Sequence, residues 1–142
     1  HTYEQFLHPR CMDEMRLRTF FDGGLCVCGS SDSPVQDMNP YTQMLGMVEF
    51  YNTRESLTAY QAFRAYTANP ARAMCEEENY GTLEVGKRAD FFTADKDFFR
   101  LPAKEIGEFR PTGTYYGGKP YRRKPGGVLG MIKMLLKIPK AV

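Results

Sequence analysis

The sequence predicts an α/β fold, and three observations support this class. Residues 12–21 have apolar side chains at helical spacing, and Asp22-Gly23-Gly24 supplies a helix stop. Next comes Leu25-Cys26-Val27-Cys28, a run that is apolar on both faces and typical of a strand buried in a parallel sheet. After Gly81, short strand-like runs alternate with glycine turns. A helix, a glycine turn, a buried strand and a polar loop, in that order, are typical of α/β proteins.

Three more helices are predicted in the middle of the chain. Residues 41–51 carry an apolar stripe of Met44, Leu45, Met47 and Val48. A better marked helix begins at Thr58, which can form a capping box with Gln61, and its predicted buried face consists of Ala59, Ala62, Phe63 and Tyr66. Pro70 disfavours a helical residue before it, so Asn69-Pro70 should end this helix. Pro70 can equally open a short helix over residues 71–75, with Asn69 as its cap.

Strands are predicted in the second half. The candidates are residues 82–85, which end at Gly86, residues 90–94, and residues 114–116 followed by 119–121. Gly117-Gly118 between the last two runs is typical of a two-residue hairpin. We assign Gly86 to a turn that requires a positive φ, Lys87 to a solvated turn position, and Ala89-Asp90 to packing and turn formation.

The end of the chain has a different character. Arg122-Arg123-Lys124 is a basic run, and Pro125-Gly126-Gly127 is a predicted hinge. The stretch that follows is apolar apart from Lys133 and Lys137, and it predicts an amphipathic helix over residues 128–137. This helix is too short to span a bilayer, and we expect it to pack on its own domain or on a dimer partner rather than on a membrane surface.

Composition and charge exclude several classes of protein. The chain has 142 residues and is 42% hydrophobic, which is enough for a buried core. Its 19 basic and 17 acidic side chains give a net charge of +2, so we predict no nucleic-acid partner and no general attraction to anionic membranes. The four scattered cysteines indicate a reduced, cytoplasmic setting. We expect Cys26 and Cys28 to be buried packing residues rather than a metal pair.

Three stretches in a fixed order resemble the C-terminal end of the amidohydrolase superfamily, in the branch of metal-dependent hydrolases that includes N-substituted formamide deformylase. The first runs from Asp22 through the apolar run to Gly29-Ser30-Ser31-Asp32-Ser33-Pro34-Val35. The second is AFRAYTANPA at residues 62–71, and the third is GTLEVGKRADF at residues 81–91. The resemblance covers residues 12–121, and its specificity lies in the combination of the three stretches.

The resemblance implies a fold and a candidate catalytic residue. In that family a metal-containing (β/α)8 barrel is joined to a small β-sandwich built from both chain ends. Residues 25–28 would then be the last barrel strand, and Asp32 would lie just beyond its C-terminal end, where barrel active sites are found. Asp32 would occupy the place of the family's aspartate, which contacts the metal or its bound water and shuttles the proton. By analogy, Pro34 and Val35 would line the substrate pocket.

Local spacing by itself favours a different role for Asp32. An aspartate in an S-x-D-S-P loop is most simply a turn or N-cap residue. Together with the resemblance, however, we expect Asp32 to be catalytic and to be a metal ligand only alongside ligands that this chain lacks. The sequence has only His1 and His8, and neither matches a ligand position of the family. The expected cofactor is therefore a divalent metal, zinc, in a longer protein, and none in this chain alone.

Length leads to the same expectation, since a (β/α)8 barrel takes roughly 250 residues. We expect residues 1–80 to be the C-terminal end of the barrel, incomplete as a barrel on its own. Residues 81–121 would be the C-terminal part of the β-sandwich, and residues 122–142 the basic hinge and amphipathic tail. The predicted function is a C-terminal portion, inactive alone, of a metal-dependent amidohydrolase that cleaves C–N bonds in small amide-type substrates, other than peptide bonds.

The competing hypothesis is a non-catalytic interaction or dimerisation module. Exposed apolar faces or the tail could support a homo-oligomer. A His-x-His pair after an apolar strand upstream of this chain would favour the hydrolase, and its absence would favour the module.

Overall fold

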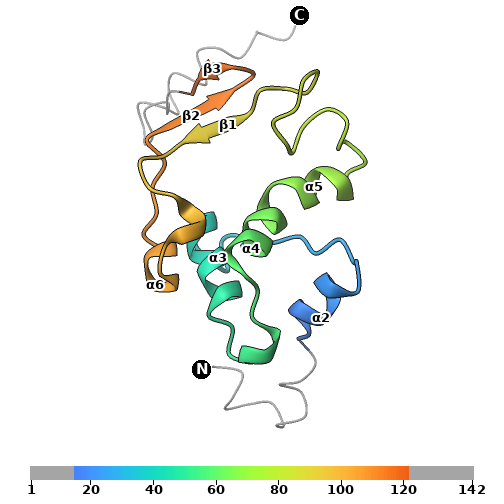
Figure 1. The fold of residues 1–142 in the computed structure, drawn as a ribbon, viewed down its shortest axis with the longest axis vertical. Coiled ribbons are helices and arrows are strands. Elements are labelled where there is room, and N and C mark those ends of the chain that lie inside the picture. Colours follow the sequence, from blue (N-terminus) through green and yellow to red (C-terminus); the bar gives the residue numbers. More distant parts are fainter. Residues whose placement is uncertain (1–14, 122–142) are drawn as a thin grey trace, which may run out of the picture.

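A computed structural model describes residues 15–121, and its helices and strands fall into two groups (Figure 1). A small sheet lies at one end, and most of the helices lie together at the other. The elements in chain order are α2 (Leu17–Asp22), α3 (Pro40–Val48), η2 (Thr53–Glu55), α4 (Ala59–Tyr66), α5 (Ala68–Ala73), β1 (Phe91–Thr93), η3 (Phe98–Arg100), α6 (Ala103–Ile106), β2 (Gly113–Tyr116) and β3 (Lys119–Pro120).

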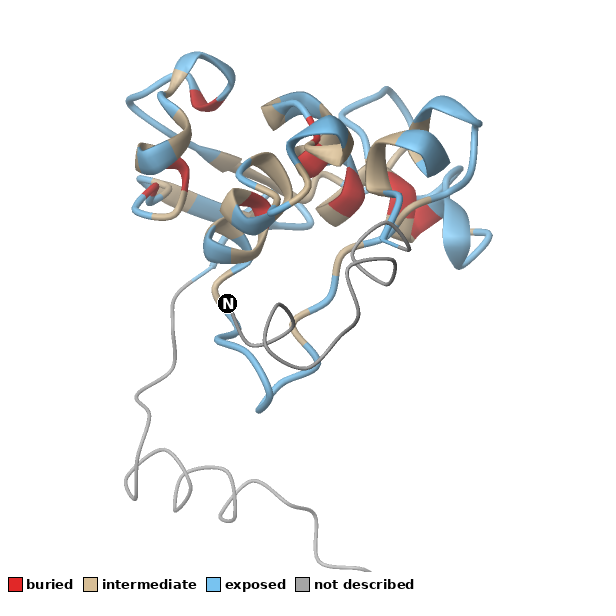
Figure 2. Ribbon diagram, turned by 90° about the horizontal axis from the view of Figure 1, so that it is seen from below, coloured by how far each residue is buried: buried red, intermediate tan, exposed pale blue. Residues whose placement is uncertain are grey.

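The hydrophobic core lies among α3, α4, η3 and α6. Its buried members are Met44, Ala62, Phe98, Ile106 and Phe109. Partly buried aromatic rings pack around them, and the Tyr41 and Phe109 ring centroids are 4.9 Å apart in an edge-on arrangement. Figure 2 shows that buried residues are few and that most of the ribbon is exposed or half-buried. The core is therefore small and depends heavily on aromatic contacts.

The capping box predicted for α4 is confirmed. Thr58 Oγ1 accepts a hydrogen bond from the Gln61 amide at 3.2 Å, and Gln61 Oε1 accepts one from the Thr58 amide at 2.9 Å. Of the face predicted to be buried, Ala62 is fully enclosed and Phe63 and Tyr66 are half-buried. Ala65 is also buried, so the buried face extends further round the helix than the apolar pattern indicated.

The predicted helix ends are partly wrong. Helix α3 begins at Pro40, capped by Asn39, and ends at Val48 rather than at residue 51. Helix α4 ends at Tyr66 because Thr67, with φ −127° and ψ −85°, leaves the helical region. Helix α5 then begins at Ala68 and includes Pro70, which is tolerated in a first turn because its missing N–H has no intrahelical acceptor there. In the described part of the first predicted helix, the helical residues are Leu17–Asp22.

The sheet is antiparallel, with strand order β1-β2-β3. Phe92 is opposite Thr114 in the first pair, and Tyr116 is opposite Lys119 in the second. The predicted Gly117-Gly118 hairpin is confirmed, and both glycines have positive φ (56° and 74°), as a tight two-residue turn requires. The stacked rings of Phe91 and Tyr115, 4.5 Å apart, add a cross-strand contact.

Two predicted strands do not form in the described structure. Residues 25–28 make no strand pairing with the described residues, so the barrel strand expected there stays a prediction. Residues 82–85 form a turn, in which Leu83 is 70% exposed and Val85 is fully exposed. Both runs have strand-like composition, but a strand also needs a hydrogen-bonding neighbour, and no described segment supplies one.

The two domains expected from the sequence share one core in the described part of the chain. Phe98, Ile106 and Phe109 follow residue 81, yet they pack with Met44 and Ala62 from the first half. The core contacts do not by themselves place a domain boundary, so the boundary expected at residue 80 stays a prediction. The tail helix predicted for residues 128–137 lies outside the described residues. Across residues 15–121, no helix has both the length and the apolar character needed to cross a membrane.

Replacing Thr58 by alanine should lower the free energy of unfolding by about 1 kcal/mol, because the Gln61 amide loses its side-chain acceptor. Urea unfolding followed by circular dichroism measures this. Thr58→Ser keeps the hydroxyl and should unfold close to the wild-type midpoint. Equal midpoints for the alanine and serine variants would show that the cap contributes nothing.

Candidate functional site

Asp32 lies in an exposed loop between α2 and α3, which we call the Asp32 loop (residues 29–35). Its φ of 48° is in the left-handed region, where aspartate is tolerated but most residues with a side chain are strained. The Asp32 amide donates to Ser30 Oγ at 3.2 Å, and the Asp32 carbonyl accepts from the Val35 amide at 2.9 Å. Left-handed backbone at a residue other than glycine is enriched at functional sites.

The hydrogen bonds of this turn are made by the Asp32 main chain rather than by its carboxylate. Among the residues that the structure describes, none donates a hydrogen bond to the carboxylate or forms an ion pair with it. Asp32 does not cap the next helix either, since the α3 cap is Asn39, whose Oδ1 accepts from the Tyr41 amide at 3.2 Å. Asp32 is thus a turn residue whose side-chain oxygens are available to other groups.

Pro34 and Val35 are also exposed, and Val35 retains 72% of its accessible surface. Three cavities of about 530, 440 and 590 Å³ are lined by other residues. The described structure therefore brings Asp32, Pro34 and Val35 together on one loop but not into a closed pocket. Their catalytic and pocket roles stay predictions.

The segment that leads into the Asp32 loop is held by helices α4 and α5 instead of by a sheet. The buried side chain of Asn69 donates from Nδ2 to the Val27 carbonyl at 2.8 Å, and the Asn69 carbonyl accepts from Cys26 Sγ at 3.3 Å. The Gly29 amide donates to the Ala65 carbonyl at 2.9 Å. Sequence reasoning assigned Asn69 only to helix-end chemistry, because nothing local to Asn69 indicates a partner 42 residues away.

The expectation that Cys26 and Cys28 are buried is wrong for the described structure, where both are exposed. Without a sheet around residues 25–28, the described residues cover these side chains only in part. Partial burial and the neighbouring Cys26 thiol raise the pKa of Cys28. Across residues 15–121, no group of three or more His, Cys, Asp or Glu side chains is placed to hold a metal ion. His1 and His8 lie outside the described residues.

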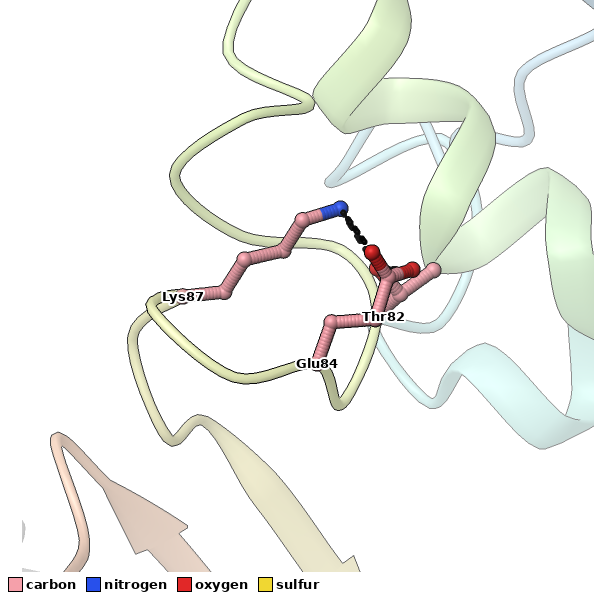
Figure 3. Close-up of polar contacts among 3 residues, drawn as sticks. All are labelled: Thr82, Glu84 and Lys87. Atoms are coloured by element: carbon pink, nitrogen blue, oxygen red, sulfur yellow. Dashed lines mark hydrogen bonds and ion pairs between the residues drawn. The ribbon is translucent and has the colours of Figure 1, made fainter.

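The 81–91 stretch folds into a turn tied together by side chains (Figure 3). Lys87 Nζ donates to Thr82 Oγ1 at 2.8 Å and lies 3.3 Å from Glu84 Oε2. The Thr82 hydroxyl and Lys87 together lower the pKa of Glu84. The Lys87 side chain is only 14% exposed, so its assignment as a solvated residue is wrong. Gly86 has the predicted positive φ, 96°.

Arg88 and Asp90 join this turn to the hairpin. Arg88 Nε donates to Asp90 Oδ2 at 2.6 Å, and the Arg88 guanidinium lies over the rings of Tyr80 and Tyr116 at 4.9 and 4.7 Å. Asp90 Oδ1 accepts from the Gly117 amide at 2.8 Å. The Arg88 hydrogen bond and the Gly117 amide hold the pKa of Asp90 below its usual value. These contacts give Asp90 the predicted turn role and do not indicate catalysis.

Comparison with known proteins shows one consistent similarity. The profile of the amidohydrolase family matches residues 2–121. N-substituted formamide deformylase of Arthrobacter pascens is 31% identical over 109 residues, which are 72% of this chain and 20% of that protein. Imidazolonepropionase of Bacteroides fragilis is 30% identical over 105 residues, 74% of this chain and 22% of that protein. The chain thus spans about a fifth of the length of these curated relatives.

Asn69→Asp should destabilise the protein at neutral pH by about 1–3 kcal/mol, because the Val27 carbonyl would lose its donor and face a carboxylate. Acidification should recover part of this loss relative to wild type, since a protonated carboxyl can donate again. Urea unfolding at several pH values measures the difference. Asn52→Asp, at an asparagine whose side chain forms no hydrogen bond with a described residue, is the matched control and should show no such recovery. Identical behaviour of the two variants would contradict the anchoring role.

Asp90→Asn should weaken the protein above about pH 4 and have no effect well below it. A carboxyl whose folded-state pKa is lowered contributes stability above its unfolded pKa, and this is lost as the pH falls through the folded pKa. Asparagine still accepts from Gly117 but cannot pair with Arg88 as an anion. Thermal melts from neutral to strongly acidic pH test the sign, and a stability difference that grows on acidification would be the opposite result. Asp95→Asn, at an exposed acid, is the control.

Proposed function

Because this chain belongs to the amidohydrolase family, we propose that it forms the C-terminal part of a hydrolase that cleaves C–N bonds, with Asp32 as its proton-transfer residue. The observation that carries the proposal is the state of Asp32: an exposed carboxylate, at a left-handed residue, with no partner among the described residues. The relatives act, by their names, on a formamide and on imidazolonepropionate. A small amide, formamide or cyclic amide is accordingly the proposed substrate class.

We further propose that residues 25–28 complete a (β/α)8 barrel in the whole protein and that β1 to β3 belong to a β-sandwich. Residues 25–28 have the apolar composition of a barrel strand but no strand neighbour in the described chain. Strand β1 has one edge unpaired by described residues, next to a cavity of about 590 Å³ lined in part by aromatic side chains. Leu83 and Val85, both exposed here, would be covered by the same partner strands.

A divalent metal fits this site only in part. Asp32 offers one hard oxygen ligand, whereas a catalytic zinc site takes three protein ligands, so the others would come from the rest of the whole protein. When bound, such a metal would act as a Lewis acid toward water and the substrate carbonyl. The described residues neither select the metal nor complete its coordination.

The chemistry proposed for Asp32 is transfer of a single proton. The carboxylate removes a proton from the attacking water while the water oxygen bonds to the carbonyl carbon. The protonated Asp32 then donates that proton to the leaving nitrogen as the C–N bond breaks, which regenerates the carboxylate. An exposed loop position just past residues 25–28 suits this task, because the side chain must reach both water and substrate.

Asp32→Asn should reduce hydrolysis by the whole protein by about 10²–10⁴-fold, because asparagine cannot take up the proton. Steady-state kinetics with an N-substituted formamide or another amide that the protein turns over measures the loss. Thermal melts should show an intact fold, since asparagine also tolerates a left-handed backbone.

Asp37→Asn is the matched control for this experiment. Asp37 is an acid in the same connection between α2 and α3, and its Oδ1 accepts only a local hydrogen bond, from the Asn39 amide at 3.2 Å. This variant should keep near-normal turnover. If Asp32→Asn is as active as Asp37→Asn, Asp32 is a structural turn residue and the proposed function is wrong.

A further inference from the structure

Gly29, the first residue of the Asp32 loop, lies directly against the ring of Tyr66. A Cβ atom added at Gly29 would lie 2.1 Å from Tyr66 Cε2, 2.4 Å from Cζ and 2.7 Å from Cδ2, closer than real side chains approach. Gly29 does not have a positive φ, so the backbone conformation alone does not require glycine here. The glycine is required because the Tyr66 ring occupies the space.

Tyr66 is a rigid surface for this contact. It is the last residue of α4, a helix that begins with a complete capping box, and the neighbouring Ala65 carbonyl accepts from the Gly29 amide at 2.9 Å. The first residue of the loop, Gly29, is therefore held at the end of α4 by a hydrogen bond and lies in contact with the Tyr66 ring. The Asn69 hydrogen bond to Val27 fixes the chain two residues earlier.

The Tyr66 hydroxyl adds little to this arrangement. It is buried, and no described residue forms a hydrogen bond with it. Burial also raises the pKa of Tyr66, so the hydroxyl stays protonated at neutral pH. A buried hydroxyl without a partner does not stabilise the fold. The feature that acts on the loop is hence the shape of the ring.

We propose that Tyr66 is a positioning residue, whose ring seats Gly29 and thereby sets the position of the Asp32 carboxylate relative to helix α4. This inference rests on the function proposed for Asp32, which is three residues beyond the contact. A methyl group at residue 29 would have to move the loop away from the ring. Misplacing a catalytic group by about 1 Å can cost about 10²-fold in rate.

The test compares five variants in the whole protein by steady-state kinetics. Gly29→Ala should lower kcat by about 10²-fold, because the displaced loop carries the Asp32 carboxylate away from its working position. An accompanying rise in KM would report Pro34 and Val35, which lie on the same loop. Tyr66→Val removes all three of the ring atoms that meet the added Cβ, so the double variant Gly29→Ala/Tyr66→Val should recover part of the lost kcat. Tyr66→Phe keeps the ring and should keep turnover. Gly46→Ala, where an added Cβ meets nothing within 4 Å, is the matched glycine control.

Thermal unfolding of the same variants gives a second readout that does not depend on activity. The losses of Tm from Gly29→Ala and Tyr66→Val should be less than additive in the double variant, as expected for two residues in contact. Additive losses would overturn the inference. Near-normal turnover of Gly29→Ala, no recovery in the double variant, or a loss of kcat in Tyr66→Phe would each overturn it as well.

Asp32→Asn, assayed in parallel, separates the two proposals. If Asp32→Asn is inactive while Gly29→Ala is normal, only the positioning role of Tyr66 fails. If Asp32→Asn is active, the proposed function fails, and the positioning role fails with it.

Discussion

The buried amide of Asn69 is the interaction on which the candidate site depends. Its hydrogen bond to the Val27 carbonyl attaches the run after α2 to α5, and no sheet does so in the described chain. Asn69 is the one buried polar side chain in the described part, and its amide is satisfied, as burial of a polar group requires. The Asp32 loop begins just beyond this attachment, so the position of Asp32 follows from a contact made 37 residues further along the chain.

The small aromatic core supports that attachment by packing against helix α4. Phe98, Ile106 and Phe109 pack against Met44 and Ala62, so that α3 packs against both α4 and α6 and η3 packs against α4. Helix α4 in turn supplies the Ala65 carbonyl and the Tyr66 ring that contact Gly29. The hairpin contacts this core through Phe92 of β1, and Arg88 and Asp90 join it to the 81–91 turn. The described chain consequently has two connected parts, of which the helical one carries the candidate site.

The proposed place of this chain in a larger hydrolase of the amidohydrolase family would account for the open features of the structure. Several features are unusual for a self-contained domain: exposed Leu25, Leu83 and Val85, an edge of β1 that no described residue pairs with, and exposed thiols. All are natural if further strands cover them in the whole protein. The exposed Asp32 carboxylate, which has no partner among the described residues, belongs to the same set of features.

The features that the sequence by itself determined are those whose physical cause is local. Thr58 and Gln61 are three residues apart, so the capping box and the start of α4 follow from backbone geometry. Gly117-Gly118 specifies its own turn through positive φ. Tertiary structure decided the remainder: whether residues 25–28 and 82–85 pair as strands, where Asn69 finds its acceptor, and why residue 29 is glycine. Each depends on a partner that is dozens of residues away or outside the described chain. A local sequence pattern cannot indicate which residue that partner is.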